Sequence, residues 1–177
     1  MVGSRGLGGF LGLVVGSVSL ELAATASCPV AVIRSDLHPG GPVVVAVDES
    51  GSPGPLQDAS TIASASRGGL TVVHVRHTPA GYRRFHDSPE ALAASGEVLR
   101  TAVESARVRA PAVPVEGILL TDTSVPHAIL NASRNAALLV VGSKGHGLVR
   151  ETIGSTAHAI LHHAHGPVLV SRHGSGS

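Results

Sequence analysis

The chain has 177 residues, of which 43% are hydrophobic and 14% charged, and its net charge is +1 with neutral histidines. This length suits one α/β domain with some chain left over, and this composition excludes wholesale disorder. The near-neutral charge and an aromatic content of 2% exclude a nucleic-acid binder that relies on a basic field or on base stacking. Cys28 is the single cysteine, so no internal disulfide is possible, which fits a reducing compartment.

The N-terminal residues admit two interpretations. Arg5, the apolar stretch 7–20 and the small residues at 23–27 resemble a secretory or lipoprotein signal, although the stretch is too short and glycine-rich to span a bilayer. The alternative is an internal repeat, because residues 3–34 align with residues 142–172 after one deletion. The aligned pairs are Gly3 with Gly142, Gly6 with Gly145, Gly8 with Gly147, Gly16 with Gly154, Ser17 with Ser155, Pro29 with Pro167 and Arg34 with Arg172. A signal peptide has no reason to recur, so the repeat is favoured.

From residue 42 the sequence alternates between strand-like and helix-like segments. Pro42–Val47 is a continuous β-branched run that predicts a strand buried on both faces, and it ends at Asp48. A short helix is predicted at Leu56–Ser66, followed by a second buried strand at Leu70–Val75. Residues 78–88 are polar and irregular, which predicts a loop.

The alternation continues in the second half of the chain. The strongest helix pattern is Pro89–Arg109, where a proline suits the first turn after Ser88 and apolar residues recur at helical spacing. A third strand is predicted at Val113–Leu120. The next helix is predicted at Val125–Asn135, with Ser124 as its N-cap.

The last elements complete an α/β pattern. Ala137–Val141 predicts a fourth strand that runs directly into a glycine-rich loop, Ser155–His163 predicts a helix, and Pro167–Ser171 predicts a fifth strand. Regular alternation of this kind predicts an α/β fold with an open, five-stranded, mostly parallel sheet sandwiched by helices.

The same pattern predicts how the chain is divided. Residues 43–172 hold all five strands and are expected to form one complete domain. Residues 1–34 hold only a loop, a helix and a strand, so we expect a C-terminal remnant of a first copy that cannot fold independently. Residues 35–42 are the predicted linker, and residues 173–177 are a Gly/Ser tail that is expected to be disordered.

The glycine-rich loop after the fourth strand has the chemistry of a phosphate site. Gly142, Gly145 and Gly154 allow the backbone to approach an anion closely, and the N–H groups at the start of the following helix point toward it. Ser155 can cap that helix and offer a hydroxyl. Taken alone, such a loop is equally compatible with a tight turn that binds nothing. The sequence contains neither a GxxxxGK[ST] motif nor a GxGxxG motif after the first strand.

The spacing of these glycines resembles the signature of the universal stress protein family, Gly-x2-Gly-x9-Gly-[Ser/Thr] after the fourth strand of an α/β sandwich. The N-terminal copy matches it in full with Gly3, Gly6, nine residues and Gly16-Ser17, and the second copy has Gly142, Gly145, eight residues and Gly154-Ser155. The opening strand also resembles the family's Val-Asp-Gly-Ser segment, with Glu49 in the glycine position.

The resemblance implies an adenine-nucleotide α-hydrolase-like fold and a nucleotide-binding regulatory or stress-response protein with no or incidental hydrolysis. By the same resemblance Asp48 would contact the ribose or adenine, Val75 would flank the adenine, and the loop would hold the phosphates. The expected ligand is ATP, with or without Mg²⁺, because Glu151 beside the phosphates would repel them unless a cation intervenes. The predicted binding residues are Asp48, Val75, Val141, Gly142, Lys144, Gly145, His146, Gly154, Ser155 and Thr156.

Three other functions remain compatible with the sequence. The rivals are a nucleotide-free member of the same fold that acts by dimerisation, a secreted or lipid-anchored protein, and a hydrolase or nucleotidyl-transfer enzyme on a related fold. His158 and His162 could share a metal, but no third ligand is evident, so they are predicted to be surface residues. His74 is predicted to be a satisfied core residue. No catalytic constellation is present, so we expect a cytoplasmic non-enzyme with no metal, nucleic-acid or membrane partner.

The last prediction concerns the strand retained in the N-terminal segment. Family members commonly pair through the last strand, so a homodimer through that strand is expected, and tandem copies often mimic this pairing within one chain. An apolar edge strand is a liability that a second strand relieves. We therefore predict that residues 29–33 pair with or pack beside residues 167–171, in the same chain or in a partner. The loop at 3–16 should then be poorly ordered and bind no ligand, because no sheet of its own supports it.

Overall fold

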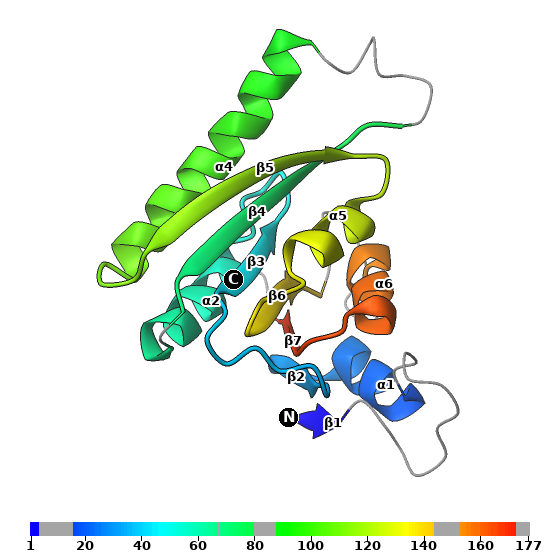
Figure 1. The fold of residues 1–177 in the computed structure, drawn as a ribbon. Coiled ribbons are helices and arrows are strands. Elements are labelled where there is room, and N and C mark those ends of the chain that lie inside the picture. The colour runs from blue at the N-terminus through cyan, green and yellow to red at the C-terminus, as the bar shows by residue number, and fades with distance from the viewer. Residues whose placement is uncertain (4–15, 67, 80–87, 144–152, 173–177) are drawn as a thin grey trace.

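The structure is a computed structural model that describes residues 1–3, 16–66, 68–79, 88–143 and 153–172. Within these residues, one seven-stranded sheet carries helices on both faces (Figure 1). The strands are β1 (Val2–Gly3), β2 (Val30–Ile33), β3 (Val43–Val47), β4 (Leu70–His77), β5 (Val115–Asp122), β6 (Leu138–Gly142) and β7 (Val168–Ser171). The helices are α1 (Ser17–Thr25), α2 (Pro53–Ala65), α4 (Pro89–Arg109), α5 (Val125–Ala132) and α6 (Ser155–His163).

The sheet is parallel apart from one junction. Its strand order is β1-β2-β7-β6-β3-β4-β5, and the antiparallel pair is β2 with β7. β3 lies in the interior of the sheet, where Val45 pairs with Val72 on one side and Val140 on the other. The β-branched runs form these inner strands because a strand covered on both faces needs apolar side chains in both directions. The α/β class and the mostly parallel sheet are therefore confirmed.

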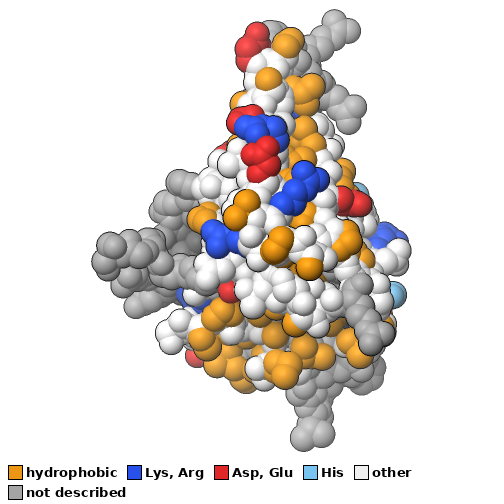
Figure 2. Space-filling model, turned by 90° about the vertical axis from the view of Figure 1, so that its left-hand side faces the viewer, with side chains coloured by type: hydrophobic (Ala, Val, Ile, Leu, Met, Phe, Trp, Pro, Cys, Tyr) orange, Lys and Arg blue, Asp and Glu red, His pale blue; other side chains and the backbone are white. Residues whose placement is uncertain are grey.

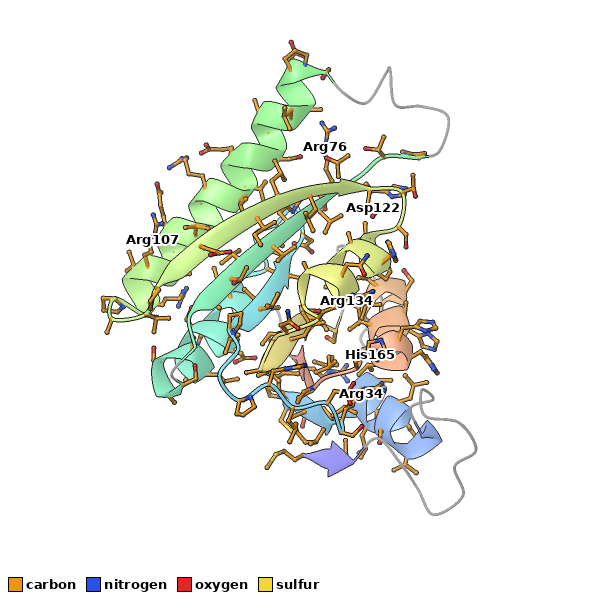
Figure 3. The ribbon with its side chains drawn as sticks, in the orientation of Figure 1. Arg34, Arg76, Arg107, Asp122, Arg134 and His165 are labelled. Carbon is orange, nitrogen blue, oxygen red and sulfur yellow. The ribbon has the colours of Figure 1, made fainter. Side chains whose placement is uncertain are left out.

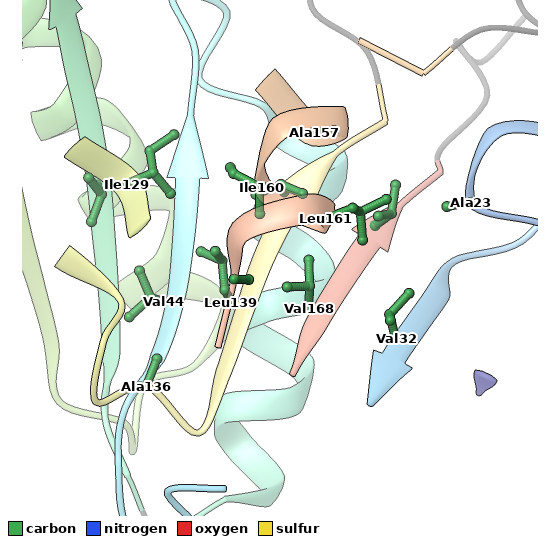
Figure 4. Packing of buried hydrophobic residues seen from close by; sticks show 14 of the residues in the cluster. Ala23, Val32, Val44, Ile129, Ala136, Leu139, Ala157, Ile160, Leu161 and Val168 are labelled. Carbon is green, nitrogen blue, oxygen red and sulfur yellow. The ribbon is translucent and has the colours of Figure 1, made fainter. Parts of the chain in front are cut away.

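Two apolar layers hold the helices onto the sheet. On one face, side chains of α1, α5 and α6 pack against the strands through residues such as Ala23, Ile129 and Ile160 (Figure 4). On the other face, α2 and α4 pack through residues such as Leu56 and Val103. The sheet is therefore sandwiched between helices, as predicted.

Local signals explain most helix boundaries. Helix α4 has the predicted bounds, and the hydroxyl of Ser88 accepts a hydrogen bond from the N–H of Ala91 at 3.1 Å. Ser124 occupies the N-cap position of α5 as predicted, but its side chain makes no capping bond. Asp122 Oδ1 instead accepts from the N–H of Ser124 at 2.8 Å.

The solvent face of α4 carries ion pairs centred on Arg100. Arg100 contacts Glu97 and Glu104 one turn away on either side, and all three side chains are more than half exposed. Figure 2 shows acidic and basic side chains side by side along the narrow upper part of the molecule. Exposed pairs of this kind contribute little to stability, so α4 is held mainly by its buried apolar side.

The N-terminal segment joins the main sheet. β2 pairs with β7 in the register Val30 with Val170 and Val32 with Val168, which confirms the predicted pairing and places it within one chain. β1 then adds beside β2, so the sheet has seven strands rather than five. β7 now has a strand on each side, so its pairing with a second copy would require two chains to exchange β2. Most of the loop at 3–16 lies outside the described residues, as does the tail at 173–177.

Among the described residues, no helix is both long enough and apolar enough to cross a membrane.

Candidate functional site

A cavity of about 310 Å³ opens at the carboxyl ends of the central strands. The chain passes from β3 to β4 and β5 on one side of β3, and later returns to β6 on the other side. Parallel sheets bind ligands at such a reversal of strand order, because the loops diverge there and leave a crevice. The cavity is lined by Ala46, Val47, Asp48, Glu49, Ser52, His74, Val75, His77, Val125, Ile129, Val141, Gly142, Gly154, Ser155, Thr156 and Ala157.

The structure brings most of the predicted residues together around this cavity. Seven of the ten line it: Asp48 after β3, Val75 in β4, Val141 and Gly142 in β6, and Gly154, Ser155 and Thr156 at the start of α6. The other three, Lys144, Gly145 and His146, lie outside the described residues. The role of each residue in binding stays a prediction.

Asp48 is held by a tight turn between β3 and α2. Its Oδ1 accepts hydrogen bonds from the N–H of Ser50 at 2.9 Å and from the hydroxyl of Ser52 at 3.0 Å, and Ser52 Oγ accepts from the N–H of Asp48. Gly51 and Ser52 have φ of 76° and 44°, so the turn uses the left-handed region that glycine adopts without strain. These bonds orient the Asp48 carboxylate at the cavity before any ligand arrives.

The opposite wall is the N-terminal end of α6. Its first helical hydrogen bond runs from the N–H of His158 to the carbonyl of Gly154 at 2.9 Å, so the N–H groups before His158 precede the helical ladder. Such groups, with the helix dipole, attract anions. The N-cap is Gly154, and Ser155 is the first helical residue, so the predicted cap by Ser155 is wrong. A hydrogen bond from the N–H of Gly154 to the carbonyl of Ser143 at 2.8 Å joins the helix to the end of β6.

The charge of the walls is uneven. Asp48 and Glu49 supply carboxylates, and no lysine or arginine in the described part of the chain lines the cavity. The attraction for an anion therefore comes from the end of α6 and, by prediction, from Lys144 in the loop outside the described residues. This arrangement separates a carboxylate side, suited to hydroxyl groups, from a backbone N–H side, suited to phosphate.

The third wall is apolar and was predicted only in part. Val75 is 7% exposed, and Val125 and Ile129 of α5 face the same cavity. Sequence reasoning missed both α5 residues and Ser52, although α5 starts directly after the carboxyl end of β5. His74 is 2% exposed with its Nδ1 3.0 Å from the carbonyl oxygen of Val47, which confirms a satisfied core histidine.

The histidines of α6 lie away from the cavity. The ring centroids of His158 and His162 are 4.6 Å apart, and His158 is exposed as predicted whereas His162 is half-buried. Burial lowers the pKa of His162, and repulsion from His158, His163 and Arg34 lowers it further. Among the described residues, no group of three metal-ligating side chains comes together.

The fold and the cavity agree with what sequence comparison finds. A model of the universal stress protein family matches residues 1–34 and 41–172. The chain belongs to this family. The separate match of the first segment agrees with the repeat, while the division into remnant, linker and complete domain stays a prediction.

Relatives within the family cover the same range of sequence. Universal stress protein Rv2005c of Mycobacterium tuberculosis is 35% identical over 182 residues, which is 97% of this chain and 61% of that protein. The chain thus spans about three fifths of the length of this relative. A universal stress protein from Archaeoglobus fulgidus, solved in complex with dAMP, is 27% identical with a TM-score of 0.59, covering 73% of this chain and 96% of that one.

A second solved universal stress protein is in complex with cAMP. It is 22% identical with a TM-score of 0.54 and covers 73% of this chain and 96% of its own, so it supports the shared fold alone.

Proposed function

We propose that this universal stress protein binds an adenine nucleotide in the cavity between β3, β6 and the start of α6. The observation that carries the proposal is the convergence of seven predicted residues, from four separate segments, on one cavity at the strand-order reversal. The dAMP complex of the Archaeoglobus relative supports the ligand class.

The walls suggest an orientation for the ligand. The apolar wall of Val75, Val125 and Ile129 suits the flat purine ring, whose burial there releases water from apolar surface. The carboxylate of Asp48 is an acceptor for ribose hydroxyls, which are hydrogen-bond donors. The N–H groups of α6 would then face the phosphates.

The finer form of the proposal is ATP with Mg²⁺. A triphosphate adds negative charge to a cavity that already contains the carboxylates of Asp48 and Glu49, and a divalent cation would offset that repulsion. We further propose a cytoplasmic regulatory protein with no or only incidental hydrolysis of its ligand. A homodimer remains part of the proposal, reached by exchange of β2 between two chains.

Titration calorimetry with ATP and MgCl₂ tests the binding. Asp48→Asn keeps an acceptor oxygen for the turn but removes the charge, and Gly154→Val puts a side chain at the entry to α6. Each is expected to weaken binding at least about tenfold, because loss of a charge-assisted hydrogen bond or of close backbone approach costs over ~1 kcal/mol.

Ser50→Ala is the matched control. Ser50 contributes to the same turn, with its hydroxyl 2.5 Å from Asp48 Oδ1, but does not line the cavity. Its affinity should stay within about twofold of the parent, on the scale of one exposed hydrogen bond. Absence of ATP binding to the parent protein would disprove the proposal and favour a nucleotide-free member of the family.

A further inference from the structure

The N-terminal segment reaches the helix of the cavity through one buried arginine. Arg34 follows β2 and is 8% exposed, and its Nη2 donates a hydrogen bond to the carbonyl oxygen of Leu161. Leu161 lies in the last turn of α6, where helix carbonyls lack partners within the helix and the dipole favours a positive charge. Figure 3 shows Arg34 just beyond the C-terminal end of α6, between that helix and β2.

An equivalent contact runs from the second copy to the first. Arg172 follows β7, and its Nη1 donates to the carbonyl oxygen of Ala23 at 3.1 Å, in the last turn of α1. Leu161 lies as many residues after Ala23 as Arg172 lies after Arg34, so the two bonds are equivalent under the repeat. The strands between them pair in a register centred on Ala31 opposite Leu169, which are also equivalent positions. The two copies thus hold each other's helices by a reciprocal exchange of arginines.

The two arginine contacts are equivalent, but the two helices that accept them differ in their relation to the cavity. The other end of α6 supplies Gly154, Ser155, Thr156 and Ala157 to the cavity, whereas none of the described residues of α1 lines it. With nine residues, α6 is about 13 Å long, so Arg34 sits one short rigid helix away from the cavity. A shift of this helix at its C-terminal end would therefore also move the residues that line the cavity.

The burial of Arg34 indicates a role other than stability. Burial lowers the pKa of its guanidinium, and Nε has no hydrogen-bond partner within the described part of the chain. Removing a charged group from water in this way is costly, and an apolar residue would fill an apolar interface without that cost. A directional bond to one carbonyl, however, sets the position of the helix that accepts it.

We propose that Arg34 is a positioning residue for the nucleotide site: it holds α6 in place, so that docking of β2 and binding of nucleotide strengthen each other. The coupling between docking of β2 and nucleotide binding rests on the proposed function. Because coupling between two sites is reciprocal, a nucleotide on α6 must stabilise the docked N-terminal segment as much as that segment favours the nucleotide.

The test compares Arg34→Met with Arg172→Met. Each variant replaces a guanidinium at the same interface with an apolar side chain of similar length. Arg34 donates to a carbonyl of α6, whereas Arg172 donates to a carbonyl of α1. In ligand-free protein, amide hydrogen exchange in α6 should rise about tenfold in Arg34→Met, whereas in Arg172→Met the rise should be confined to α1. With ATP and MgCl₂, Kd should increase about fivefold in Arg34→Met and stay within about twofold in Arg172→Met.

Two further measurements keep the proposal falsifiable. Arg34→Lys keeps the charge and should restore part of the protection of α6, and it serves as the test variant should Arg34→Met not fold. ATP should slow amide exchange in β2 of the parent protein but not in Arg34→Met. Equal α6 exchange in the Arg34 variants and the parent would overturn the positioning role. If the parent binds no ATP, the proposed function fails while the ligand-free exchange still decides the role of Arg34.

Discussion

The two copies of the repeat can be compared directly, because α1–β2 and α6–β7 have the same order, lengths and pairing in one sheet. Their surroundings differ. Ile160 in α6 is fully buried beneath α5, while its equivalent in α1, Leu22, is 38% exposed. Val18 is 67% exposed, whereas Thr156 at the equivalent position lines the cavity. A similar sequence therefore forms the same elements twice, and the neighbouring elements decide which copy is buried and which carries a site.

Deleting residues 1–35 removes the first copy altogether and should have the largest effect on stability. The deletion uncovers the edge of β7 and removes Val30 and Val32, which are 7% and 0% exposed. Two buried valines at ~1.5–3 kcal/mol each predict a loss of about 3–6 kcal/mol in unfolding free energy, measured by urea denaturation. The bared strand should also promote self-association, detectable by light scattering.

The control for that deletion removes residues 1–15 alone. This shorter deletion keeps α1, β2 and the pairing with β7 but loses β1. Its stability should remain much closer to that of the parent. If the deletion of 1–35 leaves the midpoint, solubility and oligomeric state unchanged, the segment is a passive remnant.

Two substitutions at equivalent positions of α6 and α1 compare how well each helix is buried. Ile160→Ala leaves a cavity in a packed layer and should cost about 2–4 kcal/mol of unfolding free energy. Leu22→Ala removes a similar side chain at the equivalent position of α1, where much of it is already in water, and should cost less than about 1 kcal/mol. Denaturation curves with equal losses would show that α1 is covered as well as α6.

The smallest expected effect is a pH dependence carried by His162. Its pKa in the folded protein lies below the ordinary 6.5, so the unfolded chain takes up the proton first as pH falls. Stability is therefore complete above about pH 6.5 and declines as pH falls from there toward the lowered pKa of the folded state. His162→Ala installs the residue of the first copy, Ala24, and should reduce the drop in Tm between pH 7.5 and 5.5.

His38→Ala provides the comparison for that measurement, because His38 is exposed in the predicted linker. It should leave the pH dependence unchanged. An equal drop in Tm between pH 7.5 and 5.5 in the parent, His162→Ala and His38→Ala would show that His162 does not contribute to the pH dependence.

Local patterns predicted most elements but fewer of their contacts. Pro89–Arg109 has the predicted bounds because its proline, its Ser88 cap and its apolar spacing act within a few residues of each other. Ser124 is the N-cap of α5 as predicted, although the side-chain hydrogen bond there comes from Asp122. The predicted cap at Ser155 is wrong, because Gly154 occupies that position. The bond from Arg34 to Leu161 joins residues 127 positions apart, and no local pattern indicates it.

The sequence by itself determined the α/β class, most of the strands and helices, the repeat and the glycine-rich approach to α6. These features depend on side-chain periodicity and backbone freedom over short stretches, which are properties of neighbours in the chain. Only the tertiary structure decided that β2 joins β7 within the same chain and that Val125 and Ile129 of α5 line the cavity. It also decided that Arg34 and Arg172 each donate a hydrogen bond to the helix of the other copy. Each of these depends on burial and directional bonds between distant segments, which exist only once the sheet has assembled.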